Sequence, residues 1–291
     1  MTPKIIIHGG FFSESKTNRE VKAAKQKALS EIVKKSFSFL QSHSALETVV
    51  IAVELLENCD LFNAGTGSQI QSDGKIRMSA SLMDGGSEKF SGVINIRDIK
   101  NPIRLAEKLL NFEDRVLAGD EALNFARKNG FGYYNPEIPE RRKAFEEKIR
   151  LTPNPSPLAE GRNGTVGCVA LDKNGKLAAA TSTGGKGFEI PGRVSDSATV
   201  AGNYANEFCG VSCTGVGEDI VNAALAAKIV TRVTDGNSLK NSVEKSFNEL
   251  KKYDGFAGVI CIDSKGNFYH CDSFPYMVYA LSDENGVKVF E

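Results

Sequence analysis

The sequence has no excess of charge of either sign and no long apolar run. Lys plus Arg and Asp plus Glu both number 36, so the formal net charge is zero. A neutral chain without a basic stretch does not favour a nucleic-acid partner. No window approaches the ~18 consecutive apolar residues that a membrane span requires. We therefore expect neither nucleic acid nor a membrane among the partners of this protein.

Histidine is scarce, and cysteine lacks the spacing of a metal site. There are three histidines, and the six cysteines include no Cys-x-x-Cys pair, so a zinc site is not expected. The cysteines lie mostly in apolar segments, which favours buried free thiols and a cytoplasmic location. The N-terminus, MTPKIIIHGGFF, has one lysine and a short apolar run, typical of a first strand rather than a signal peptide.

The 291 residues are 41% hydrophobic, enough for one large domain or two small ones. Periodicity predicts a first strand at 4–8, and Ser44 with Glu47 forms a capping-box pattern at a helix start. The other expected elements are helices at 15–43, 47–58, 103–110, 119–130, 139–150, 217–231 and 237–252, a hairpin over 68–86 turned at Asp73–Gly74, and strands at 90–96, 256–263, 267–273 and 277–282. Strands and helices come in runs, so we expect an α+β fold in which helices shelter antiparallel sheets.

The stretch GRNGTVGCVALDKNGKLAAATSTGG, residues 161–185, predicts a hairpin with Asn174–Gly175 in its turn. A three-residue loop, 173–175, would place Thr165 opposite Thr183. A two-residue turn would shift the register by one and place Gly184 there instead. Either register brings the two threonines close together.

Residues 152–164 are rich in proline and glycine without apolar periodicity, which predicts a flexible linker. The linker ends at Gly164, directly before the strand that Thr165 begins. One interpretation is a surface loop entering a hairpin. The other is self-processing, in which Thr165 attacks the Gly164 carbonyl and becomes a new N-terminus. Its freed α-amine, with a reference pKa of ~7.7–8.0, could then take the proton of its own hydroxyl.

Several motifs occur together and in order: IHGG at 7–10, LENCDLFNAGTGS at 56–68, ASLMDGG at 80–86, GTVG at 164–167, GRVSDS at 192–197 and CTGVG at 213–217. In this combination the chain resembles the plant-type asparaginases, also called isoaspartyl peptidases, which are N-terminal nucleophile hydrolases. The resemblance implies a four-layer αββα sandwich and cleavage into subunits 1–164 and 165–291. It also implies an (αβ)₂ heterotetramer and no cofactor for catalysis.

The resemblance assigns a role to each of several residues. Thr165 would be the nucleophile and Thr183 its hydrogen-bond partner, with Asn63 beside it. Arg193 would bind the α-carboxylate of the substrate, and Asp196 and the Gly217 carbonyl its α-amine. Thr214 and Gly215 would form the oxyanion hole. A structural sodium ion would be held by the backbone carbonyls of Leu56, Glu57, Cys59, Phe62, Ala64 and Thr66.

Each residue also has an ordinary structural interpretation when taken alone. Arg193 and Asp196 could be an exposed ion pair, Thr214 the end of a strand, and Asn63 an Asx-turn residue. The chain departs from the family pattern at Phe11–Phe12, Ser195 and Val216.

The implied activity is cleavage of β-aspartyl amide bonds in isoaspartyl dipeptides and in L-asparagine, with no preference indicated between them. The alternatives are a glycosylasparaginase-like hydrolase and a catalytically silent homologue that binds a metabolite.

Overall fold

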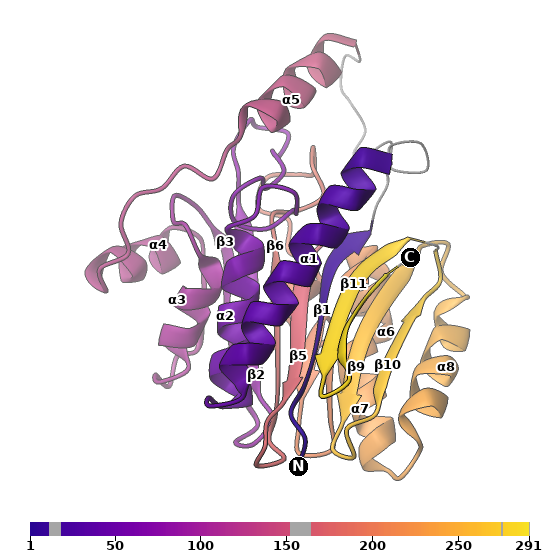
Figure 1. The fold of residues 1–291 in the computed structure, drawn as a ribbon. Helices are drawn as coiled ribbons and strands as arrows, with labels where there is room; N and C mark the ends of the chain where they lie inside the picture. The colour runs from indigo at the N-terminus through magenta and orange to yellow at the C-terminus, as the bar shows by residue number, and fades with distance from the viewer. Residues whose placement is uncertain (12–18, 152–163, 275, 291) are drawn as a thin grey trace.

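The computed structural model describes residues 1–11, 19–151, 164–274 and 276–290. The predicted flexible linker lies outside these ranges except for Gly164, and so does Phe12. Two β-sheets and eight helices longer than one turn make up the described parts, which confirms a mixed α and β fold (Figure 1). No helix in these ranges is long and apolar enough to cross a membrane.

The larger sheet has eight strands, antiparallel except for the pair β3 and β4. In spatial order they are β12 (Gly286–Val289), β11 (Met277–Asp283), β1 (Lys4–Phe11), β5 (Val166–Leu171), β6 (Leu177–Thr183), β2 (Met78–Asp84), β3 (Lys89–Ile96) and β4 (Val116–Ala118). The smaller sheet is antiparallel and runs β10 (Phe268–Asp272), β9 (Ala257–Asp263), β8 (Cys209–Gly215) and β7 (Asn203–Ala205).

Helices flank both sheets in Figure 1. Those on the side of the larger sheet are α1 (Arg19–Leu40), α2 (Ala45–Glu57), α3 (Pro102–Leu109) and α4 (Gly119–Lys128). Those on the side of the smaller sheet are α6 (Gly217–Ala223), α7 (Leu225–Thr234) and α8 (Leu239–Leu250). Helix α5 (Pro139–Leu151) projects from the body and buries only Phe145. Helix α2 begins with the predicted capping box, Ser44 with Glu47.

Three apolar clusters hold these elements together. The first joins α1, α2 and α3 to the larger sheet through residues such as Leu29, Val53 and Ile103. The second joins α7 and α8 to the smaller sheet. The third contains Ile6 and Ile260 and lies between strands of the two sheets. Burial of apolar area on both faces of each sheet accounts for the largely apolar sequences of their central strands.

The β5–β6 hairpin has the register that a three-residue loop predicts. Val166 pairs with Ser182 and Leu171 with Leu177. Gly175 has φ 76°, the left-handed conformation that such a loop needs at its last residue. Continued by one residue, this register places Thr165 opposite Thr183.

Two predicted elements were wrong. Residues 68–77 form no strand, and β2 instead makes its hairpin with β3 through residues 85–88. The predicted helix 217–231 is broken at Ala224, whose φ is 47°. The short strands β4, β7 and β12 were not predicted.

Candidate active site

The Gly164–Thr165 junction opens into a cavity of about 410 Å³ between the two sheets' ends. The cavity brings together seven of the predicted residues, which come from four separate segments of the chain. They are Gly164, Thr165, Thr183, Arg193, Asp196, Gly215 and Gly217.

The backbone at Gly164 is packed too closely for a side chain. A Cβ there would lie 2.6 Å from both Phe11 N and Thr214 Oγ1. A Cβ on Gly10, whose φ is 84°, would in turn lie 2.5 Å from the Gly164 carbonyl carbon. Glycine is therefore required at both 10 and 164, where the two backbone segments approach each other. The carbonyl that precedes Thr165 is held in a fixed place as a result.

The Thr165 hydroxyl has a hydrogen-bond partner that the sequence did not indicate. Thr165 Oγ1 lies 3.1 Å from Ser197 Oγ, and both side chains are buried. Thr183 Oγ1 lines the same cavity and accepts a hydrogen bond from Gly185 N at 3.2 Å. Ser197 follows Asp196 in the motif GRVSDS, but nothing in the motif shows which way its side chain points.

Thr214 offers a polar atom without a partner beside this junction. Its side chain is fully buried on β8, and Oγ1 makes no hydrogen bond to any described residue. An unpaired buried hydroxyl costs free energy, so its position next to Gly164 suits a donor that awaits a developing charge. Gly215 follows in the cavity wall with φ 138°, and a Cβ there would lie 2.3 Å from Phe256 O.

Arg193 is already paired with a carboxylate. Its Nε donates to Glu218 Oε1 at 2.8 Å and its Nη2 to Glu218 Oε2 at 2.7 Å. Lys186 Nζ lies 3.5 Å from the same carboxylate. The Arg193 hydrogen bonds lower the pKa of Glu218 to about 2. Glu218 therefore fixes the guanidinium in the cavity wall and leaves Nη1 and the second hydrogen of Nη2 for another acceptor. The alternative interpretation, an exposed ion pair of Arg193 with Asp196, is not the pair that forms.

Asp196 is buried between two glycines. A Cβ on Gly202 would lie 2.6 Å from Asp196 Oδ2, and one on Gly217 would lie 2.8 Å from Asp196 Oδ1. Oδ2 has no hydrogen-bond partner among the described residues. Burial raises the pKa of this carboxyl to about 6, while the Arg193 charge acts in the opposite direction. A carboxylate with an unpaired oxygen in a cavity is suited to an ammonium group.

Asn63 contacts the segment that follows Thr183, next to the cavity. Its Nδ2 donates to Gly185 O, its backbone O accepts from Gly184 N at 2.9 Å, and its Oδ1 accepts from Gln69 N at 3.0 Å. A Cβ on Gly184 would lie 2.6 Å from Asn63 Oδ1. Asn63 thus anchors the chain that follows Thr183, and it is not itself part of the cavity wall.

A buried histidine lies beneath the site. His8 Nε2 is 2.9 Å from Ser212 Oγ, which is 2.7 Å from Thr181 Oγ1. Burial lowers the pKa of His8 to about 3, with a hydrogen bond from the imidazole to the Thr165 backbone as a weaker opposing cause. His8 is therefore neutral near pH 7 and acts as a polar support between three strands. The motif IHGG contains His8, but not its partners.

The family departures that lie within the described residues fall at the cavity. Phe11, Ser195 and Val216 line it. Phe11 is buried at the end of β1 and contacts the edge of Phe256, with ring centroids 4.8 Å apart. Phe11 therefore forms an apolar wall beside Gly164.

The loop that follows α2 folds back on itself. Thr66 N donates to Glu57 O at 2.8 Å, and Gly65 has φ 57°. The carbonyl oxygens of Leu56, Glu57 and Cys59 each accept a backbone hydrogen bond. Those of Phe62, Ala64 and Thr66 accept none from the described residues. Phe62 and Ala64 are buried and Thr66 is half-buried. Carbonyl oxygens without a donor are the kind of ligand that a hard cation requires.

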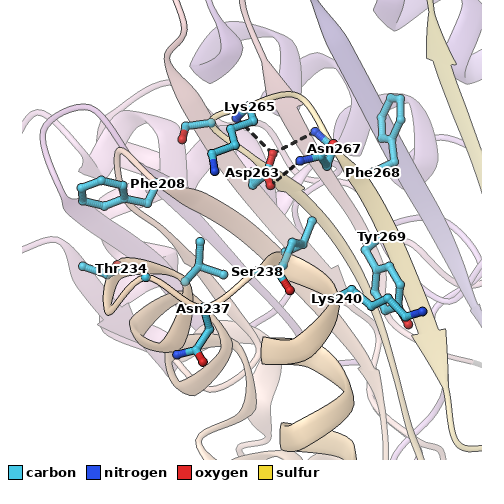
Figure 2. Close-up of a pocket in the computed structure, with 14 residues that line it drawn as sticks. Phe208, Thr234, Asn237, Ser238, Lys240, Asp263, Lys265, Asn267, Phe268 and Tyr269 are labelled. Carbon is cyan, nitrogen blue, oxygen red and sulfur yellow. Dashed lines mark hydrogen bonds between the residues drawn. The ribbon is translucent and has the colours of Figure 1, made fainter.

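A second cavity, of about 450 Å³, lies at the opposite end of the smaller sheet near the start of α8 (Figure 2). Its buried carboxylate, Asp263, points into its own turn. It accepts hydrogen bonds from Lys265 N, Asn267 N and Asn267 Nδ2 at 2.8–3.0 Å. Figure 2 shows all three bonds. None of the predicted site residues lines this cavity, so we place the candidate active site at Thr165.

A buried hydroxyl next to a fixed glycine carbonyl, with an arginine and an unpaired carboxylate in one cavity, defines a hydrolase of the N-terminal nucleophile class. The asparaginase family model matches residues 1–290, and the chain belongs to that family.

The chain is 47% identical to an isoaspartyl peptidase/L-asparaginase of Synechocystis sp., over 96% of this chain and 88% of that protein. It is 38% identical to a plant-type L-asparaginase of Pyrococcus furiosus, over 98% and 97%. It is also 38% identical to an isoaspartyl peptidase of Escherichia coli, over 90% and 87%.

Proposed function

We propose that this protein is a self-processing amidohydrolase that cleaves β-aspartyl amide bonds in isoaspartyl dipeptides and in L-asparagine. The observation that carries the proposal is the packing of Gly164 against Gly10, Phe11 and Thr214, directly before the buried Thr165 hydroxyl. The names of the relatives support the substrate class.

Self-cleavage comes first. Thr165 Oγ1 attacks the Gly164 carbonyl carbon, the acyl group moves from nitrogen to oxygen, and water hydrolyses the ester. Residues 165–291 then begin with a free α-amine. The oxygen of the tetrahedral intermediate takes up negative charge, and the unpaired Thr214 hydroxyl is the nearby donor.

Substrate hydrolysis follows with the same nucleophile. The α-amine of Thr165 takes the hydroxyl proton while Oγ1 attacks the side-chain carbonyl carbon of the aspartyl group. The amide C–N bond then breaks, the proton passes to the amine or ammonia that leaves, and water hydrolyses the ester to restore the Thr165 hydroxyl. Arg193 binds the free α-carboxylate through the donors that Glu218 leaves, and Asp196 binds the α-amine with the Gly217 carbonyl. An α-linked Asp-X peptide has no free α-carboxylate at this place, so we expect it to be excluded.

The finer architecture belongs to the same proposal. The three apolar clusters support a four-layer αββα sandwich, divided at Gly164 into an α subunit of residues 1–164 and a β subunit of residues 165–291. Two such pairs would form an (αβ)₂ heterotetramer. The six cysteines are all free, which supports a cytoplasmic location. The carbonyls of the 56–66 loop would hold a sodium ion as a structural support.

The test compares matched dipeptides with the wild-type protein and the Thr165→Ala variant. The wild type should separate into fragments 1–164 and 165–291, detected by intact mass. It should hydrolyse β-Asp-Leu and asparagine at least 10³-fold faster, in kcat/KM, than α-Asp-Leu. Thr165→Ala should stay whole and inactive. Comparable rates on both linkages would contradict the proposed substrate pocket. Hydrolysis of glycosylated asparagine alone would favour the glycosylasparaginase alternative. Binding of substrate without turnover would favour the catalytically silent homologue.

A further inference from the structure

The two steps of the proposed function place different demands on the Thr165 hydroxyl. In substrate hydrolysis the free α-amine of Thr165 can take the proton. In self-cleavage the same nitrogen belongs to the Gly164–Thr165 amide, which is not a base. The hydroxyl must therefore be directed at the Gly164 carbonyl by another group in the uncleaved chain.

Ser197 is the side chain that contacts the hydroxyl in the uncleaved chain. Its Oγ lies 3.1 Å from Thr165 Oγ1, and Ser197 is fully buried. Among the described residues no hydrogen bond joins the Thr165 and Thr183 hydroxyls, and Thr183 Oγ1 accepts instead from Gly185 N. We propose that Ser197 is the positioning residue for self-cleavage, and that it contributes much less to substrate hydrolysis. The proposal rests on the self-processing function proposed above.

Ser197 is itself held rigidly. Its backbone oxygen accepts a hydrogen bond from Ser81 Oγ at 2.6 Å. Ser81 Oγ accepts in turn from Asn203 Nδ2 at 3.0 Å. The single 3₁₀ turn that contains Ser197, Asp196–Ala198, is thus tied to β2 and β7. A hydroxyl fixed in this way loses little entropy when it orients a neighbour, as a preorganised group should.

The step conserves its atoms. A bond forms between Thr165 Oγ1 and the Gly164 carbonyl carbon, and the bond from that carbon to Thr165 N breaks. The proton that leaves Oγ1 ends on the released nitrogen. Water then hydrolyses the ester, which leaves a carboxyl group on Gly164 and restores the Thr165 hydroxyl. Ser197 holds the hydroxyl in line and neither gains nor loses a proton overall.

The test separates the two steps in Ser197→Ala, which removes the hydroxyl and adds no bulk. The rate of self-cleavage is followed by intact mass from the freshly purified chain. The fraction that has been cleaved is then isolated and assayed on β-Asp-Leu. We expect self-cleavage to slow at least about tenfold, the effect of one lost hydrogen bond, while kcat of the cleaved fraction stays within about threefold of wild type.

Ser91→Ala is the matched control. Ser91 is also a fully buried serine, and its Oγ donates to Ala106 O at 2.7 Å, away from the cavity. It should lower the melting temperature to a similar extent and leave the self-cleavage rate unchanged. Equal slowing in both variants would reduce Ser197 to a structural role and overturn the proposal.

Two further outcomes would also overturn it. If Ser197→Ala cleaves at the wild-type rate, the hydrogen bond does not position the nucleophile. If self-cleavage and kcat fall by the same factor, Ser197 serves the nucleophile in both steps. These outcomes differ from a failure of the proposed function, in which the wild-type chain itself would remain whole.

Discussion

At the scale of single residues, Asp196 shows how binding and stability oppose each other in the cavity. Its carboxyl group is buried, and Oδ2 has no partner among the described residues. The ordinary pKa of 3.8 rises to about 6 because burial disfavours the charge. The native state therefore holds a proton more tightly than the unfolded state, and this group's contribution to stability is lost as pH rises from about 4 through 6.

Asp196→Asn should stabilise the fold at pH 8 by up to roughly 3 kcal/mol, since a pKa shift of this size corresponds to that free energy. The gain should vanish near pH 3.5, where both states carry the neutral acid. Arg193 and Glu218 are the charged groups that act on this carboxyl, and Glu218, whose pKa is lowered to about 2, stays ionised over this pH range. Urea unfolding across pH, in a Thr165→Ala background so that no chain is cleaved, measures the difference. A difference that does not change with pH would contradict the expectation.

Arg193 can be tested through its geometry, because a lysine keeps the charge but cannot contact Glu218 and a substrate carboxylate together. We expect Arg193→Lys to raise KM for β-Asp-Leu at least about tenfold and to change kcat less than threefold. Arg232→Lys is the matched control, since Arg232 of α7 pairs with Glu249 of α8 and neither residue lines the cavity. An unchanged KM would mean that Arg193 serves only to hold Glu218.

At the scale of elements, local signals predicted the β5–β6 hairpin and non-local contacts defeated two other predictions. Asn174–Gly175 locates its own turn, and of the two registers that the sequence left open the one with a three-residue loop forms. Residues 69–77 instead bond to a distant segment, through Phe188 N to Ile70 O and Ser72 N to Glu189 O. The break at Ala224 similarly accompanies a bond from Ala226 N to Ala201 O. No local pattern records such partners.

The residues of the candidate site divide in the same way, into those that local motifs located and those whose contacts are distant in the sequence. Motifs located Thr165, Thr183, Arg193 and Asp196, because each motif carries its residue in a fixed local frame. Ser197, Glu218 and His8 could not be assigned, since their roles depend on contacts with residues far away in the chain.

Thr183 ends the hairpin beside Thr165, and Thr183→Val removes its hydroxyl while keeping its shape. If this hydroxyl assists the nucleophile after self-cleavage, kcat should fall about 10²-fold, the scale of one lost polar catalytic contact. Steady-state kinetics on the cleaved fraction and a melting curve give the two readouts. A lower melting temperature with normal kcat would show that Thr183 only accepts the bond from Gly185 N.

The loop after α2 makes a prediction about sodium. A cation bound only by the folded loop should raise the melting temperature by mass action. The titration runs from a sodium-free sample, with N-methylglucamine chloride holding the ionic strength constant. A melting temperature that does not change with sodium would count against the site. The Thr165→Ala variant should respond equally, because the loop lies apart from the cleaved bond.

At the scale of the whole molecule, the candidate cleavage site divides the sequence but not the sheet. Strand β1, from the first half, lies between β5 and β11 of the second half (Figure 1). Strand β2 of the first half pairs with β6 of the second along six residue pairs. The cluster that contains Ile6 and Ile260 also draws on both halves. Cleavage at Gly164 therefore leaves the core and these three strand pairings in place.

The cleaved fragments should consequently remain one folded body. We expect residues 1–164 and 165–291 to elute together in size-exclusion chromatography, and to separate only in denaturant, with a single unfolding transition. Expressed alone, residues 165–291 would lack β1 and β2. Both outer edges of the β5–β6 hairpin and the edge of β11 that β1 normally covers would then be unpaired. Such unpaired edges favour aggregation rather than folding. A cooperative unfolding transition of that fragment by itself would show that the second half is an independent domain, and would contradict the shared core.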